Sequence, residues 1–182
     1  MNNDIKKTFP CLDLDQRFLL REHELRDAKE FLDYYTNSNV HQYILATPPT
    51  NILESESEIM YCRNLFYNHQ GIYWTIARKD NDKMIGAIGV YINYQHRRAE
   101  LCYDLNHHFW GQGITSRAIH VVKNYLFHKL QIHRLEAITL DNNPASIKVL
   151  LKEGFVHEGR LHQYKYFNHQ SHDIEMYAVT RT

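Results

Sequence analysis

Apolar residues recur along the chain with two different periods, and each change of period marks a predicted helix or strand. Residues 17–21 have an apolar centre between two arginines and predict a first strand. Apolar positions then recur at helical spacing over residues 25–35. Asn51, with Glu54 three positions later, predicts the capped start of a second helix. The first third of the chain is therefore predicted to be mainly helical.

The middle of the chain changes from helical spacing to the patterns of strands. Residues 73–78 and 84–94 predict two strands joined by a turn at residues 80–82. Residues 98–105 alternate between apolar and polar and predict a half-buried strand. The glycine turn Gly111-Gln112-Gly113 follows this strand. We therefore predict three consecutive strands that end at a tight turn.

The last third alternates between the two periods. Apolar residues at a period of 3.6 predict a helix from Ile114 to about Leu126. A strand over residues 134–140, a helix over residues 143–153 and a closing pair of strands (155–166 and 171–179) follow. This order contains too few strand–helix–strand units for a doubly wound sheet and predicts a mixed α/β fold, an α+β sandwich. Without a linker or a repeat, residues 1–182 are predicted to form a single domain.

Composition and charge narrow the classes of function. Of the 182 residues, 43% are hydrophobic and 23% are charged, which is typical of a globular protein. Lys plus Arg and Asp plus Glu both number 21, so no surplus of cations favours a nucleic-acid partner. Three scattered cysteines predict a reducing compartment. No apolar run approaches the roughly 20 residues of a membrane span, so we expect a cytoplasmic protein without a membrane partner.

The glycine turn is the first candidate for a binding site. Two glycines followed by a helix start leave backbone N–H groups free, and these can hold a phosphate. The turn lacks the lysine of a Walker loop, and Ser116 stands where a dinucleotide fingerprint has its third glycine. A turn that only connects two elements explains the same residues equally well.

The second candidate is the start of the predicted helix over residues 143–153. Asn143 suits the cap position, and Pro144 suits the first helical position. Ser146 then falls in the first turn, near the strand ends where open sheets bind ligands. For either Asn143 or Ser146 alone, a purely structural role is the better interpretation.

Taken together and in order, these motifs resemble the GNAT N-acetyltransferase superfamily. The segments that carry the resemblance are Trp110–Ser116, His133–Ala137, Asn143–Ser146 and Gly154-Phe155. Within the superfamily, the pattern is similar to the ribosomal-protein N-terminal acetyltransferases of the RimJ/RimL type. The resemblance covers nearly the whole chain. It implies acetyl-CoA as co-substrate, and a mostly antiparallel central sheet with helices on both faces. The sheet is expected to splay open between the 98–105 and 134–140 strands.

The resemblance also implies roles for individual residues. Coenzyme A is expected to contact Tyr103, Asp104, Leu105, Trp110, Gly111, Gln112, Gly113, Ile114, Thr115, Ser116, Asn143 and Ser146. The pyrophosphate would bind the N–H groups of residues 111–116, and the pantetheine arm would pair with the backbone of residues 103–105. Glu100 is implied as a base that acts through water on the amine, and Ser146 as the donor to the departing thiolate.

Four positions depart from the superfamily pattern. Thr115 stands where an alanine or glycine is usual, Arg117 where a glutamate is common, and Cys102 where a small residue is frequent. Leu150 occupies the position of a tyrosine acid found in many members. If the reaction needs an acid, Ser146 is therefore expected to supply it.

Three functions remain open from the sequence. The first is acetyl transfer, by direct attack in a ternary complex, to a protein or peptide α-amine. The second is transfer to a small amine, such as a polyamine, an aminoglycoside or an amino-acid derivative. The third is a non-catalytic acyl-CoA-binding module. The departures from the superfamily pattern at Thr115 and Arg117 favour this alternative. No metal is expected, because the histidines fit no standard zinc spacing. The chain is expected to be a monomer or a homodimer.

Overall fold

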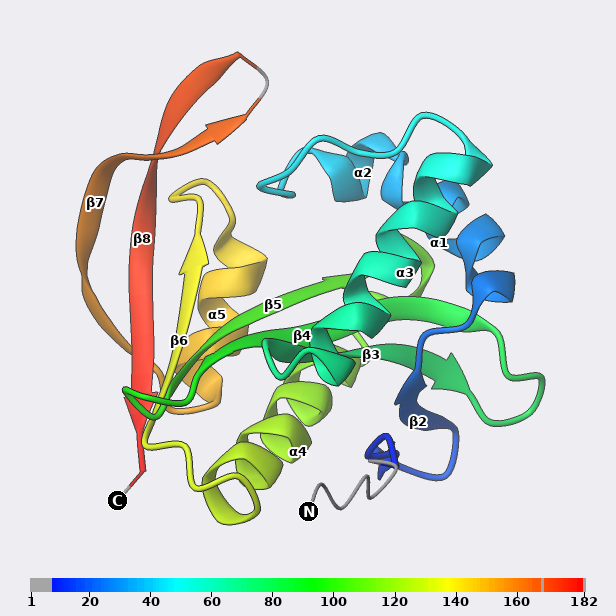
Figure 1. The fold of residues 1–182 in the computed structure, drawn as a ribbon. Helices are drawn as coiled ribbons and strands as arrows, with labels where there is room; N and C mark the ends of the chain where they lie inside the picture. Colours follow the sequence, from blue (N-terminus) through cyan, green and yellow to red (C-terminus); the bar gives the residue numbers. More distant parts are fainter. Residues whose placement is uncertain (1–7, 168, 182) are drawn as a thin grey trace.

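A sheet of eight strands runs through the molecule (Figure 1). The structure, a computed structural model, describes residues 8–167 and 169–181. The strands follow the order β1 (Leu12–Asp13), β2 (Phe18–Glu22), β3 (Gly71–Arg78), β4 (Met84–Asn93), β5 (Arg98–Leu105), β6 (Arg134–Thr139), β8 (Gln170–Thr180) and β7 (Val156–Phe167). Neighbouring strands are antiparallel except β5 and β6, which are parallel. The predicted mostly antiparallel sheet is confirmed.

Helices cover both faces of this sheet, as predicted. They are α1 (Ala28–Tyr35), α2 (Ser38–His41), α3 (Ile52–Tyr67), α4 (Ile114–His128) and α5 (Pro144–Lys152), with 3-10 turns at Leu25–Asp27 and His107–Phe109. Figure 1 shows α1, α2 and α3 on one side of the sheet and α4 on the other. The larger apolar core joins the sheet to α4 and α5, and a smaller one joins it to α1 and α2. Among the described helices, none is long and apolar enough to cross a membrane.

The sheet opens between β5 and β6. These strands pair from Arg98 and Arg134 to Leu101 and Ala137 and no further. Beyond that point β6 stays paired with β8, as far as Thr139 opposite Glu175, and so leaves β5. Residues 102–105 of β5 therefore have no partner in β6. The predicted splay is confirmed.

Two short elements were not predicted from the pattern. Strand β1 has two residues and helix α2 has four, so neither spans a full period of apolar residues. All the helices and strands that the sequence predicted are present, in the predicted order.

A buried histidine makes the fold sensitive to acid. His23 is 3% exposed, and its Nδ1 lies 2.6 Å from the hydroxyl of Thr75. Burial lowers the pKa of His23 to about 4. In the unfolded chain His23 is protonated below about pH 6.5, whereas in the folded chain it is protonated only below about pH 4. This stabilisation is complete above pH 6.5 and is lost as the pH falls toward 4.

We expect His23 to contribute about 2–3 kcal/mol to the loss of stability between pH 7.5 and pH 4.5. Urea unfolding of wild type and His23→Asn at both pH values measures this contribution. The exposed His133 serves as the control. Between pH 7.5 and pH 4.5, His133→Asn should lose as much unfolding free energy as wild type does. The assignment is wrong if His23→Asn shows the same pH dependence as wild type.

Candidate functional site

The opening between β5 and β6 exposes one edge of the β5 backbone. The N–H of Asn106 donates to the carbonyl of Ile85 at 2.8 Å. This bond and the register show that the backbone groups of Asp104 and Cys102 form hydrogen bonds toward β4. By the alternation of an antiparallel ladder, the backbone groups of Tyr103 and Leu105 point to the other side, into the opening. The indole Nε1 of Trp110 donates to the carbonyl of Leu105 at 2.9 Å. The N–H and carbonyl of Tyr103 are thus the strongest candidates to pair with an extended ligand.

The segment from Trp110 to Ser116 forms the turn predicted from its glycines. Gly111 and Gly113 have φ values of 75° and 68°, in the left-handed region that favours glycine. Gly113 is the cap residue of α4 and offers no side chain to the first turn. The first backbone N–H groups of α4 have no partner within the helix and carry the positive end of its dipole. This arrangement can hold a phosphate.

Arg117 braces this turn from the side. Its Nη1 donates to the carbonyl of Gln112 at 3.1 Å, and its Nη2 lies 3.0 Å from a carboxylate oxygen of Asp15. The arginine that replaces the superfamily's common glutamate is therefore held by two contacts. Its positive charge remains next to the predicted phosphate position.

The side chain of Ser116 has a structural contact. Its hydroxyl donates to the carboxylate of Glu153, the residue that ends α5. Lys123 lies 3.7 Å from the same carboxylate. These contacts tie α4 to the end of α5, so Ser116 can offer a phosphate only its backbone N–H. The side chain of Thr115 is half-buried at the same helix start.

The start of α5 lies beside the opening. Asn143 caps the helix, and its Oδ1 accepts from the N–H of Ser146 at 3.1 Å. The hydroxyl of Ser146 lies 2.7 Å from the hydroxyl of Tyr103 on β5. Burial raises the pKa of Tyr103, which keeps its hydroxyl protonated. The sequence indicated a role for the backbone of Tyr103 but did not reveal this pair of hydroxyls.

Glu100 lies on the other face of the sheet. Side chains alternate along β5, so Glu100, Cys102 and Asp104 face away from Tyr103. The hydroxyl of Tyr34 on α1 donates to Asp104 at 2.5 Å, which shows that this is the face covered by α1. Within the described residues, no hydrogen bond joins Glu100 to Ser146. The two residues implied in catalysis thus lie on opposite faces of the sheet, and Glu100 stands opposite Glu136 in the part of β5 that still pairs with β6.

Cys102 lies between Glu100 and Asp104 on the same face. Burial raises the pKa of the Cys102 thiol to about 11, so the thiol stays protonated at neutral pH. A protonated thiol is a poor nucleophile. We therefore assign Cys102 no chemical step.

A cavity of about 470 Å³ lies next to the start of α5, at the end of β6. It is lined by Gln42, Leu140, Asp141, Asn142, Arg160, Phe167, Ser171, His172 and Asp173. These residues come from the end of α2, the β6–α5 loop and the β7–β8 hairpin. Periodicity did not indicate them, because they come from three separate segments of the chain.

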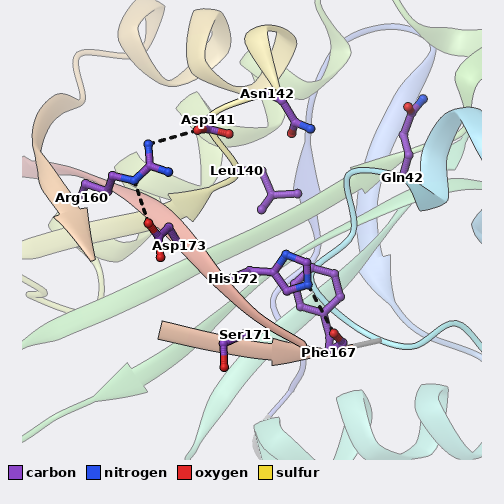
Figure 2. Close-up of a pocket in the computed structure, with 9 residues that line it drawn as sticks. All are labelled: Gln42, Leu140, Asp141, Asn142, Arg160, Phe167, Ser171, His172 and Asp173. Atoms are coloured by element: carbon purple, nitrogen blue, oxygen red, sulfur yellow. Dashed lines mark hydrogen bonds and ion pairs between the residues drawn. The ribbon is translucent and has the colours of Figure 1, made fainter. Parts of the chain in front are cut away.

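Charged side chains line one wall of this cavity (Figure 2). Arg160 lies between Asp141 and Asp173, with nitrogen–oxygen distances of 3.1 Å to each. A hydrogen bond from the N–H of Gln163, together with His162 and Arg160, lowers the pKa of Asp173 to about 2. Asp173 is therefore ionised at any physiological pH. Two carboxylates against one guanidinium leave this wall with a negative charge.

Two histidines in this region contact other side chains. His162 Nδ1 lies 2.9 Å from Asp173. The ring of His172 stacks on Phe167 at 3.8 Å between centroids. Among the described residues, no group of three or more His, Cys, Asp or Glu side chains is placed to hold a metal ion.

Comparison with known proteins gives consistent matches along the chain. A family model described as an acetyltransferase (GNAT) domain matches residues 17–156. The chain is 34% identical over 174 residues to the uncharacterized N-acetyltransferase YoaA of Bacillus subtilis, which covers 95% of this chain and 98% of that protein. It is 33% identical over 151 residues to the spermidine N(1)-acetyltransferase of Escherichia coli, which covers 83% of this chain and 79% of that protein. It is 32% identical to the ribosomal-protein-serine acetyltransferase of the same organism, over 53% of this chain and 55% of that protein.

Solved structures share the fold at lower sequence identity. RimL, a ribosomal alpha-N-protein acetyltransferase solved in complex with coenzyme A, has a TM-score of 0.84 at 21% identity. The alignment covers 94% of this chain and 98% of RimL. The microcin C7 self-immunity acetyltransferase MccE, solved with acetyl-CoA and AMP, has a TM-score of 0.82 at 22% identity and covers 92% of this chain and 94% of MccE.

Proposed function

The chain belongs to the GNAT family of acetyltransferases and is an N-acetyltransferase that uses acetyl-CoA, and from this we propose that its acceptor is the N-terminal α-amine of a protein or peptide. Membership of the family gives the reaction, acetyl transfer to an amine, and the geometry of the site bears on which amine accepts the acetyl group. The observation that carries this proposal is the cavity at the end of β6, next to Asn143.

The opening between β5 and β6 suits the pantetheine arm. An extended arm in this gap can pair with the N–H and carbonyl of Tyr103, where β6 has left the sheet. At one end of the gap, the turn at Gly111–Gly113 and the start of α4 can hold the pyrophosphate. At the other, Ser146 and Tyr103 can donate to the thioester sulfur. Asn143 stands beside them at the start of α5.

The chemistry divides between the two faces of the sheet. An ammonium group must first lose a proton, which we assign to Glu100 through a water molecule. The free amine then attacks the thioester carbonyl carbon, and the carbon–sulfur bond breaks. The thiolate takes a proton from the Ser146 hydroxyl, which is restored by the second proton of the attacking nitrogen. The products are an acetylated amine and coenzyme A, with one proton released to solvent.

The cavity suits the end of a peptide chain. Walls from α2, the β6–α5 loop and the β7–β8 hairpin surround a space large enough for several residues. Its carboxylates, Asp141 and Asp173, attract a cationic peptide toward the site.

A small polyamine is the second candidate acceptor. The negative wall of the cavity favours a substrate with more than one cationic group. Similarity to a spermidine N(1)-acetyltransferase over 83% of the chain supports the same class.

Coenzyme A release from acetyl-CoA, measured with a panel of acceptors, tests the proposal. The panel contains peptides with free N-termini, the same peptides with blocked N-termini, and spermidine, and mass spectrometry locates the acetyl group. We expect acetylation of the free α-amine and none of the blocked peptides. A preference for spermidine over all peptides would contradict the peptide acceptor. Acetyl-CoA binding without acetylation of any amine would instead indicate a non-catalytic module.

A further inference from the structure

Asp104 is a carboxylate without an ion-pair partner among the described residues. It lies on β5 beyond the last residue that pairs with β6, and therefore beside the opening. Tyr34 and the N–H of Ala87 donate to it at 2.5 Å and 3.1 Å, and both bonds end on Oδ1. Within the described residues, Oδ2 has no hydrogen-bond partner, and no Lys, Arg or His forms an ion pair with Asp104.

A half-buried carboxylate without a counter-ion is unfavourable for the fold. The protein around Asp104 raises the pKa of this side chain to about 6 through burial, even though Tyr34 and Ala87 stabilise its ionised form. It is nevertheless mostly ionised at pH 7.5. Tyr34 and Ala87 use only Oδ1, so Oδ2 can accept from a charged ligand. The substrate of an N-acetyltransferase arrives as an ammonium ion.

The neighbours of Asp104 are suited to a cation. On α1, the rings of Tyr34 and Tyr35 lie 6.3 Å apart on this face of the sheet. On α3, the carboxylate of Glu58 adds a further negative charge near Asp104. On β5, Glu100 and Cys102 lie on the same face of the sheet as Asp104. The positive charge of Lys165 on β7 lowers the pKa of the Cys102 thiol. The carboxylates and the half-buried ring of Tyr35 favour a positively charged ligand, whereas Tyr34 is buried and contributes its hydroxyl to Asp104.

We propose that Asp104, oriented by Tyr34, anchors the ammonium group of the acceptor on the α1 face of the opening. This inference rests on the proposed function, and it adds an acceptor-binding residue to it. It also separates two tasks. Asp104 binds the acceptor as a cation, and Glu100, four residues earlier on the same face, receives the proton through water. The ammonium group of the acceptor then neutralises the negative charge of Asp104.

Steady-state kinetics with the best acceptor from the panel tests the proposal. In Asp104→Asn we expect the acceptor KM to rise roughly 30-fold, while kcat changes less than about threefold, because a charge-assisted contact is lost in binding. The affinity for acetyl-CoA should stay unchanged. Asparagine keeps an oxygen for Tyr34 and Ala87, so the variant should fold, and its Tm at pH 7.5 should equal or exceed that of wild type. Asp33→Asn, on the exposed side of α1, is the matched control.

The pH dependence of the acceptor KM gives a readout that a structural role would not move. In wild type the KM should rise as the pH falls below 6, because Asp104 takes up a proton. This rise should be absent in Asp104→Asn. In Tyr34→Phe it should begin at higher pH, because the hydrogen bond that favours the ionised carboxylate is gone.

Two results would overturn the assignment. One is an unchanged acceptor KM in Asp104→Asn, and the other is the same rise of KM at low pH in wild type and Asp104→Asn. The failure of the proposed function has a different signature, because wild type would then bind acetyl-CoA and acetylate no amine.

Discussion

Replacing Gly113 by proline is expected to weaken acetyl-CoA binding by more than about 100-fold. Gly113 has a φ of 68°, whereas proline is fixed near −65°, so the turn cannot keep its shape. Proline also removes a backbone N–H from the group that we propose holds the pyrophosphate. Isothermal titration calorimetry with acetyl-CoA measures the loss.

Two neighbouring substitutions act as controls. The side chain of Gln112 is exposed, and the contact of this residue with Arg117 uses its backbone carbonyl, so Gln112→Ala should bind acetyl-CoA within about twofold of wild type. In Gly113→Ala, the new Cβ would lie 3.3 Å from Nη1 of Arg117, at an unfavourable φ, and should weaken binding less than proline does. Wild-type affinity in a folded Gly113→Pro would place the cofactor elsewhere.

Replacing Glu100 by glutamine is expected to lower turnover about 100-fold while leaving acetyl-CoA affinity nearly unchanged. The carboxylate is proposed to take the proton of the amine through water, and the amide cannot. The rate of the variant should recover in part at high pH, where the acceptor is already deprotonated. Initial rates of coenzyme A release from pH 6 to pH 9.5, at saturating acceptor, measure both effects. Glu56→Gln on α3 should behave as wild type.

The hydroxyl pair on the other face should also matter for turnover. Ser146→Ala removes the proposed donor to the thiolate and should lower kcat by roughly tenfold or more. Tyr103→Phe keeps the ring and removes the hydroxyl that lies 2.7 Å from Ser146, and it should lower kcat less. Wild-type turnover in both Glu100→Gln and Ser146→Ala at pH 7 would show that neither residue is catalytic. The rate would then come from binding the two substrates side by side.

The periodic elements and the position of the opening were predictable from the sequence. Strand β5 alternates clearly, and α4 has a continuous apolar stripe. Local rules also placed the caps, since Asn143 and Asn51 both accept the backbone N–H three residues on. The opening itself followed from the resemblance and was confirmed by the short register between β5 and β6.

Contacts between distant segments could not be predicted in this way. Tyr103 and Ser146 are 43 residues apart, and Tyr34 and Asp104 are 70 residues apart. Neither pair leaves a periodic signal, because each depends on how the helices pack on the sheet. The cavity wall at Asp141, Arg160 and Asp173 likewise depends on the pairing of β7 with β8. In such cases the sequence shows the residue types but not their partners.

Amide hydrogen exchange with and without acetyl-CoA tests most directly the claim that the opening between β5 and β6 holds the cofactor. We expect saturating acetyl-CoA to slow exchange at Tyr103 and at residues 111–116, because their N–H groups would then bond to the arm and the pyrophosphate. Amides of β4 that already bond within the sheet, such as that of Ile92 to Gln70 at 2.8 Å, should change little. Unchanged exchange at Tyr103 and at residues 111–116 under saturating acetyl-CoA would contradict the account.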